Sequence, residues 1–361
     1  MAHMDVFTND AFSVGQMVDT AQRVPYVPGM LGSMNLFTPK PVRTEFFTIE
    51  ERDGKLAIIQ TTKRGSPPVA SDSTKRRRIR RFDTVRVADG DRISASEIAG
   101  VRAFGSETEL MQIQDLVVDK MSTLRTNMEV THEWHRLGAL QGKLFDADGT
   151  LIFDYFSEFN GIGGGTGVAP TDIAFALNTP TTDIATLINA SVLRPMMRAS
   201  VGAWIPNRTA VGALCGDSFY DKLTHHATVI SSYNNWQAAE ATRKPFGVSN
   251  VDQSGTFAAF YYGGVYWYNY RGADNFDGVT PGIKSLGVAT NKAKFFPINA
   301  PGVFQVGLSP GETFDWVNTP GQETYSMLVP DLLRNSYVDV EMYSYPLYIC
   351  TRPEMLLAGT V

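Results

Sequence analysis

Six basic residues occupy the seven positions from 75 to 81, and the residues around them have the composition of β-strands. Side chains alternate between the two faces of a strand, so this strand would carry charge on both faces. A strand of that kind cannot be half-buried in an ordinary sheet. The sequence therefore predicts a strand that returns along an arm standing away from the body of the protein.

The residues before this strand complete the predicted arm. Residues 44–50 have a strand pattern, Asp53-Gly54 is a turn signal, and residues 56–62 form a second strand pattern. Residues 65–73, which include two prolines, are predicted to form the tip, and the Arg-rich strand then returns from residue 75 to residue 87.

The arm and the body carry opposite charge. The arm holds eight basic residues and one acid between positions 63 and 81, a net +7, which leaves 24 basic and 36 acidic residues, or −12, on the rest of the chain. The basic residues are Lys63, Arg64, Lys75, Arg76, Arg77, Arg78, Arg80 and Arg81. These residues could bind nucleic acid, act as a localisation signal or contact an acidic protein surface. An arm laid over an acidic neighbour accounts for both signs, so we favour intersubunit contact, with nucleic acid second.

Charged residues make up 19% of the chain, below the usual value of about 25%. A large core would explain this low fraction. A surface covered by partner subunits would also explain it, because the centres of interfaces are depleted in charge.

A long helix is predicted over residues 106–137. Ser106 and Glu109 fit a capping box, and apolar residues from Leu110 to Met128 then recur every three or four positions until Gly138 follows the last turn. About 31 residues make a rod of roughly 45 Å, which suits the spine of a domain. A hairpin is predicted next, with strands at 140–145 and 150–156.

The second half has mixed patterns. A glycine-rich stretch at 161–167 predicts a linker, and residues 181–199 predict a helix capped near Asp183. Strands are predicted near Trp204, at 257–262 and at 265–270, and a short strand at a sheet edge or end within 344–357. The eight aromatic residues of 257–270 favour a hairpin packed on both faces over a sugar-binding or base-stacking platform.

No motif predicts catalysis or a cofactor. The glycine stretch lacks the Lys-Ser/Thr of a phosphate loop, and Cys215 has no identifiable base. His132 and His135 are three residues apart with no third ligand indicated, so we interpret them as a solvated helix end rather than a metal site. Two distant cysteines in apolar surroundings suit a reducing compartment, and no signal or membrane-spanning segment is predicted.

Several segments in order resemble the capsid protein E family, the lambda-like major capsid proteins of tailed phages. The segments that carry this resemblance are 44–50 with 56–59, Lys63-Arg64-Gly65-Ser66-Pro67, 148–151, 219–223, 262–265, 319–325 and 345–354. Each is weak alone, but seven in this order are specific.

The resemblance implies an α+β fold of the Hong Kong-phage capsid type. Its implied parts are an N-terminal arm at 1–43, an extended E-loop at 44–94, a peripheral domain at 95–180, an axial domain at 181–335 and a C-terminal return to the peripheral domain at 336–361. It implies a non-enzymatic subunit, without cofactor, that self-assembles through hexamers and pentamers into an icosahedral head.

The resemblance also implies partners and a location. A separate scaffolding protein, a portal and packaged double-stranded DNA bound without sequence specificity are expected, no membrane is expected, and a decoration protein is left open. The location would be the virion capsid, after assembly in the host bacterial cytoplasm. The alternative is an encapsulin-like compartment that holds an enzyme cargo, and a carbohydrate-binding module is a third hypothesis, resting only on the aromatic hairpin around Trp267.

Overall fold

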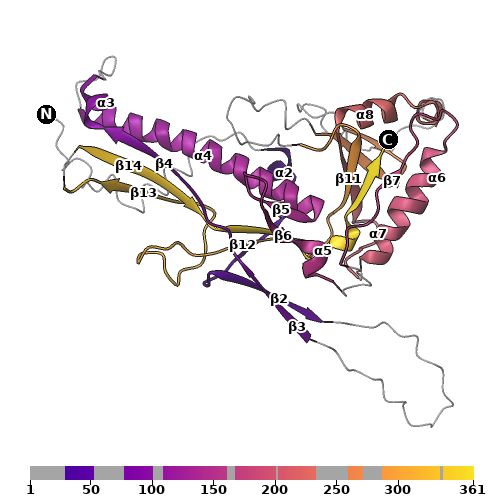
Figure 1. The fold of residues 1–361 in the computed structure, drawn as a ribbon, viewed down its shortest axis with the longest axis horizontal. Coiled ribbons are helices and arrows are strands. Elements are labelled where there is room, and N and C mark those ends of the chain that lie inside the picture. Colours follow the sequence, from indigo (N-terminus) through magenta and orange to yellow (C-terminus); the bar gives the residue numbers. More distant parts are fainter. Residues whose placement is uncertain are drawn as a thin grey trace, which may run out of the picture.

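The computed structural model describes residues 29–52, 77–100, 109–160, 167–200, 202–232, 259–270, 287–333 and 336–361. The described helices include α2 (Met30–Ser33), α3 (Ala95–Gly100), α4 (Glu109–Gln141), α5 (Tyr155–Glu158), α6 (Ile184–Ile188), α7 (Arg194–Ala199) and α8 (Asp217–Thr224). Helix α4 runs along much of the body, and a ribbon of two strands projects away from it (Figure 1). The mixture of helices and sheets confirms the predicted α+β class.

The described strands form five sheets. The largest has six strands in the order β7 (Ile173–Ala174), β16 (Leu357–Thr360), β11 (Lys292–Ile298), β8 (Ala210–Cys215), β10 (Val265–Asn269) and β9 (Ala259–Tyr262). Two sheets have three strands: β1 (Thr38–Pro41), β12 (Phe304–Leu308) and β15 (Pro346–Cys350), and β13 (Tyr325–Pro330), β14 (Tyr337–Ser344) and β4 (Val87–Ser94). Two pairs complete the set: β2 (Phe46–Arg52) with β3 (Arg77–Asp83), and β5 (Lys143–Phe145) with β6 (Leu151–Asp154).

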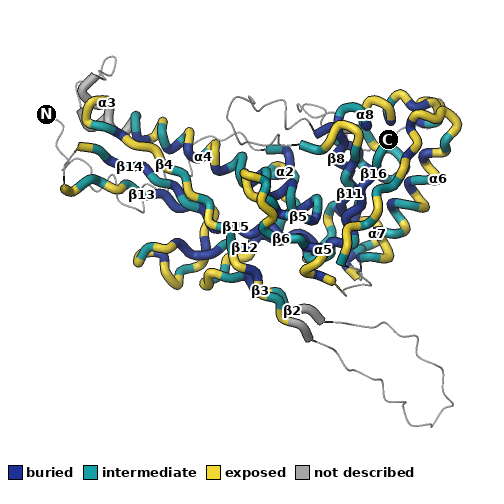
Figure 2. Tube along the Cα trace, in the orientation of Figure 1, coloured by how far each residue is buried: buried dark blue, intermediate teal, exposed yellow. Residues whose placement is uncertain are grey.

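Helix α4 packs its apolar face on the sheet of β13, β14 and β4. Val117, Met121, Leu124 and Met128 are buried against Ile93 of β4 and against Val340 and Met342 of β14. The predicted spacing of this face is therefore confirmed. Figure 2 shows buried residues along this contact and within the six-stranded sheet.

The predicted bounds of the long helix need correction at its end. The helix does not stop at Leu137 but continues to Gln141, and Gly142, at φ +79°, follows it. Gly138 lies inside the helix because it packs closely there: a Cβ at this position would be 2.9 Å from the carbonyl oxygen of Lys143. The predicted start at Ser106 lies outside the described residues.

The Arg-rich return strand is also shorter than predicted. Strand β3 ends at Asp83, three residues outside any strand follow, and β4 begins at Val87 as part of a different sheet. Strand β4 pairs with β14 from Val87↔Ser344 to Ser94↔Tyr337. A strand containing Asp-Gly-Asp has low β-propensity, and pairing with β14 together with packing on α4 outweighs it here.

The six-stranded sheet has an aromatic core. Strands β9 and β10 form the predicted aromatic hairpin, and Trp267 is fully buried among Phe175, Phe219 and Phe295, with ring centroids 5.5–6.2 Å away. This burial confirms packing on one face of the hairpin and argues against Trp267 as a sugar-binding surface. The predicted packing on both faces was wrong, since Tyr261 of β9, on the opposite face, is 58% exposed. The strand predicted near Trp204 was wrong, since the strand here begins only at Ala210.

Other local predictions agree with the structure. The hairpin after α4 is present as β5 and β6, but both strands are shorter than predicted, because residues 140–141 belong to α4 and residues 155–156 to α5. Asp183 caps α6 by accepting a hydrogen bond from the Thr186 amide. The predicted 181–199 helix is formed by α6, a π-helical turn at Asn189–Leu193 and α7. Strand β15 lies at the edge of its sheet, as its prolines indicate.

Pairings across the chain join segments from different predicted parts. Strands β12 and β13, from the predicted axial domain, pair with β15 and β14, whereas β16, from the predicted C-terminal return, lies inside the six-stranded sheet. The predicted domain bounds therefore remain a prediction rather than a division that the sheets define.

Candidate functional site

The β2–β3 ribbon is the described part of the predicted arm. Its antiparallel register runs from Phe46↔Asp83 to Arg52↔Arg77. Four predicted contact residues, Lys63, Arg64, Lys75 and Arg76, lie outside the described residues. The backbones of Arg77 and Arg78 belong to β3, and Arg80 and Arg81 follow on the same strand nearer the body.

One face of the ribbon is anchored to the body by two phenylalanines. Phe82 is 1% exposed, and its ring lies 5.7 Å from that of Phe153 and 5.6 Å from that of Phe159. Phe47 is buried against Gly307 of β12, where a Cβ would lie 2.9 Å from the phenyl ring. These contacts set the direction in which the ribbon leaves the body.

Charge lies on both faces of β3, because Arg80 and Arg81 are neighbours on a strand. On the face of Phe82, the Arg80 guanidinium lies 5.3 Å from the Phe159 ring and donates to the carbonyl oxygen of Asn160 at 3.3 Å. On the opposite face, the Arg81 guanidinium lies 3.9 Å from the Phe46 ring and pairs with Asp83 at 3.3 Å. Ile79, on that same outer face, is 75% exposed.

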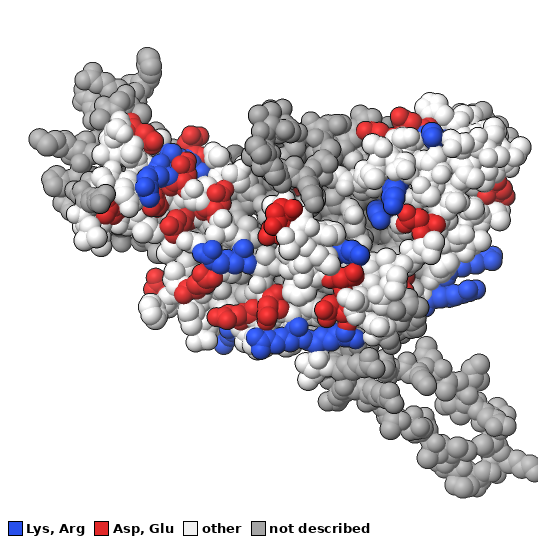
Figure 3. Space-filling model, in the orientation of Figure 1, with Lys and Arg blue, Asp and Glu red and all other residues white. Residues whose placement is uncertain are grey.

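The body presents acidic and basic side chains together (Figure 3). Several acids already have basic partners: Arg92 lies 2.7 Å from Asp339, and Lys120 lies 2.9 Å from Asp91. These pairs hold β4 to β14 and to α4. The remaining acids make the body the acidic half of the chain.

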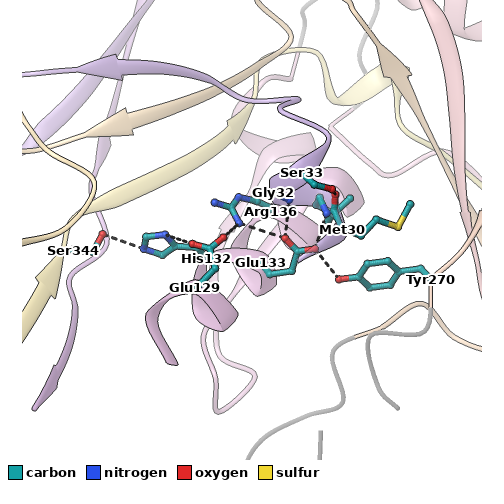
Figure 4. A network of polar contacts seen from close by, with 10 residues as sticks. Met30, Gly32, Ser33, Glu129, His132, Glu133, Arg136, Tyr270 and Ser344 are labelled. Atoms are coloured by element: carbon teal, nitrogen blue, oxygen red, sulfur yellow. Dashed lines mark hydrogen bonds and ion pairs between the residues drawn. The ribbon is translucent and has the colours of Figure 1, made fainter. Parts of the chain in front are cut away.

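A second group of polar residues joins the N-terminal helix α2 to α4 (Figure 4). The Glu133 carboxylate accepts hydrogen bonds from the amides of Leu31 at 2.7 Å and Gly32 at 3.1 Å, and from the Tyr270 hydroxyl at 3.3 Å. Glycine is needed at position 29, since a Cβ there would lie 2.3 Å from Glu133. Glu133 therefore fixes the start of the described chain to the spine helix.

Arg136 holds the carboxylates of this group together. Its guanidinium pairs with Glu129 and, at 3.4 Å, with Glu133, and it lies 5.2 Å from the Tyr348 ring. Burial raises the pKa of Tyr348, as it does that of Tyr270. Both phenols therefore stay neutral beside the carboxylates.

The prediction that His132 and His135 lie at a solvated helix end was wrong. Both are buried, at 1% and 2% exposure, in the last three turns of α4. Burial lowers the pKa of His132 to about 3, with the charge of Arg136 adding to the effect, and burial lowers the pKa of His135 to about 4. Sequence reasoning missed this group because its partners are far apart in the chain, although charged residues on the apolar side of α4 were a signal.

The fold has a distinct plan: a spine helix on a sheet, a second, six-stranded sheet and a projecting ribbon. A solved structure of a prophage protein from E. coli CFT073, described as a capsid protein, shares this fold with a TM-score of 0.59 and 11% identity, over 96% of this chain and 98% of that chain. At this identity the likeness concerns the fold alone.

Sequence comparison gives the family. The family model described as phage major capsid protein E matches residues 13–361, and the chain belongs to that family. The major capsid protein of Salmonella phage Felix O1 is 27% identical, with 96% of this chain and 95% of the relative covered. That of Pseudomonas phage KPP10 is 25% identical, with 93% of each chain covered.

The protein is thus a major capsid protein of a tailed phage and a component of the virion capsid. The family resemblance drawn from the sequence is confirmed, and the encapsulin-like alternative is not favoured. No helix among the described residues is both long enough and apolar enough to span a membrane.

Proposed function

We propose that the subunit assembles through hexamers and pentamers into an icosahedral head, with its β2–β3 ribbon serving as an E-loop that reaches over a neighbouring subunit. The observation that carries this proposal is the ribbon itself, which leaves the body as two paired strands anchored near their base by Phe47, Arg80 and Phe82. A contact between copies of the chain gives this ribbon a function.

Isolated two-stranded ribbons are marginally stable in water, and unpaired strand edges tend to find partners. In the described part of the ribbon, β2 and β3 pair only with one another, and Ile79 exposes 75% of its surface. Phe314, Leu332 and Leu333 are also almost fully exposed on the body. Apolar surface of this kind is typical of faces that other subunits cover.

The charges indicate how the ribbon recognises its neighbour. The +7 of residues 63–81 complements the −12 of the rest of the chain, so each subunit carries both halves of one contact. Charged contacts contribute more to register and partner choice than to net stability, because desolvation offsets much of the attraction. We therefore assign Lys63, Arg64, Lys75, Arg76, Arg77, Arg78, Arg80 and Arg81 to this contact.

The remaining parts follow the same scheme. We assign the β2–β3 ribbon and the segment up to residue 94 to the E-loop. We assign α4, β13 and β14 to the peripheral domain, and the six-stranded sheet with α6 to α8 to the axial domain. A separate scaffolding protein, a portal and double-stranded DNA bound without sequence specificity are the proposed partners, and assembly takes place in the host cytoplasm. The subunit is structural and has no catalytic role.

Replacing Arg76, Arg77 and Arg78 by glutamine tests the electrostatic contact. We expect few closed particles, or particles that dissociate at salt concentrations the wild type withstands. The control replaces Arg194, Arg198 and Arg208, all exposed near the six-stranded sheet, and makes the same change in net charge. Particle yield and salt stability are read by electron microscopy and sedimentation. Unaltered particles from the ribbon variant, or equal loss in both variants, would contradict the assignment.

A further inference from the structure

Three possible metal ligands come together where α4 passes the segment that leads into β13. Glu129 and His132 lie one turn apart on α4, and Glu323 comes from a segment almost 200 residues later. A carboxylate oxygen from each glutamate and a ring nitrogen of His132 all lie within 4.8 Å of one another. The three side chains differ in burial: His132 is buried, Glu129 is partly buried and Glu323 is exposed.

The hydrogen bonds of Ser344 decide which nitrogen of His132 carries the proton. The Ser344 hydroxyl donates its single hydrogen to the backbone carbonyl of Glu323 at 2.5 Å. It must therefore accept from His132, whose Nε2 lies 3.1 Å away. A neutral imidazole has only one N–H group, so the hydrogen is on Nε2 and Nδ1 has a free lone pair.

That lone pair is buried and has no hydrogen-bond partner among the residues that the structure describes. His132 Nδ1 faces Glu129, 3.9 Å from its Oε2 atom, as Figure 4 shows. Two electron-rich atoms that face each other in a buried place repel unless something positive lies between them.

The surrounding charges favour a cation. Glu129, Glu133 and Glu323 carry three negative charges when ionised, whereas Arg136 and Arg125 supply two positive charges. Glu133 already accepts bonds from two amides and a tyrosine, so it is not available as a ligand. The acids outnumber the arginines, so a bound cation would offset the excess of negative charge.

We propose that Glu129, His132 and Glu323 bind a divalent transition-metal ion, with Zn²⁺ as the best match. Zn²⁺ accepts imidazole nitrogen together with carboxylate oxygen, whereas Ca²⁺ and Mg²⁺ prefer sites made of oxygen alone. The bond from His132 Nε2 to Ser344 is the outer contact that orients a metal-binding histidine. Water would supply the fourth ligand, and a cavity of about 210 Å³, lined in part by Glu323 and Arg136, lies beside the cluster.

The three ligand atoms must move closer together to bind Zn²⁺. Bonds of about 2.0–2.2 Å to Zn²⁺ bring tetrahedral ligand atoms to roughly 3.4 Å from one another. The Glu323 side chain is exposed and free to make most of this movement, while α4 stays in place. The ion would then link the spine helix to the segment before β13, next to the contact between α2 and Glu133.

The test measures Zn²⁺ binding by the purified full-length chain, using titration calorimetry and equilibrium dialysis. We expect one ion per wild-type chain. Glu323→Gln should bind Zn²⁺ at least about tenfold more weakly, because even the loss of a residue that only supports a metal ligand weakens binding by that factor. Asp315→Asn is the matched control, because it removes an exposed acid from the same segment, and it should bind as the wild type does.

A second variant and a spectroscopic probe separate binding at the cluster from binding elsewhere. His132→Gln should lose the site, and Co²⁺ should give the wild type a visible absorption band that Glu323→Gln lacks. Equal binding by the wild type and Glu323→Gln would overturn the proposal. So would the absence of binding by a folded wild type, which would mean that a water molecule meets the lone pair of His132.

Discussion

Replacing Glu133 by glutamine should release the N-terminal helix α2 from the spine helix. Glu133 is 3% exposed and accepts from two adjacent backbone amides of α2, those of Leu31 and Gly32. Glutamine has nearly the same shape, but one of its two terminal atoms is an NH₂ group. That group cannot accept a hydrogen bond, so one of the two amides would lose its acceptor.

The size of the effect follows from these contacts. A buried amide without an acceptor costs about 1–3 kcal/mol, and weaker pairing of Arg136 adds to it. Removing one partner of a buried ion pair typically costs about 3–5 kcal/mol, but Glu129 still pairs with Arg136 in the variant. We therefore expect the free energy of unfolding to fall by about 3 kcal/mol.

Urea unfolding of the unassembled chain measures this loss, and hydrogen exchange locates it. The amides of Leu31 and Gly32 should exchange faster in Glu133→Gln, while those in the middle of β8 should stay protected. Glu158→Gln, at an exposed position of α5, is the control and should change stability by less than about 0.5 kcal/mol. A loss below that value in Glu133→Gln, with unchanged exchange at Leu31 and Gly32, would refute the reasoning.

Two further predictions concern the core. Phe82→Ala should lower the free energy of unfolding by about 3–5 kcal/mol, because it leaves a cavity against Phe153 and Phe159. The control, Ile79→Ala on the exposed face, should lower it by less than about 0.5 kcal/mol. Similar losses for the two variants in urea unfolding would count against the anchoring of the ribbon. His135 and His132 have folded pKa values of about 4 and about 3, below the ordinary value of 6.5, so the unfolded chain binds more protons as the pH drops from 6.5 towards 4. Each of the two histidines should lower the stability by about 1.4 kcal/mol per pH unit in this range. His135→Gln should remove the contribution of His135 to the pH dependence, and parallel pH profiles for the two proteins would exclude it.

Local patterns predicted the elements whose partners are near in sequence. The apolar face of α4, the β5–β6 hairpin and the aromatic β9–β10 hairpin follow from spacing and turn signals, and the structure contains all three. The end of α4 was misplaced because glycine usually follows a helix, whereas Gly138 serves close packing inside it.

Contacts between distant segments were beyond local patterns. Strand β4 has a sequence typical of a turn, and its pairing with β14 joins residues about 250 positions apart. Glu133 meets Leu31 across 102 residues, so the sequence around His132 and His135 did not identify the segments that bury this end of α4. The basic residues of the ribbon were visible in the sequence, but the neighbour that we propose they contact is a second copy of the chain.

Cryo-electron microscopy of particles formed by the purified protein tests the central claim most directly. We expect closed shells in which the β2–β3 ribbon of each subunit lies across a neighbouring subunit, with its arginines next to acidic side chains. A chain that stays a soluble monomer under all assembly conditions, or shells in which each ribbon contacts only its own subunit, would contradict the account.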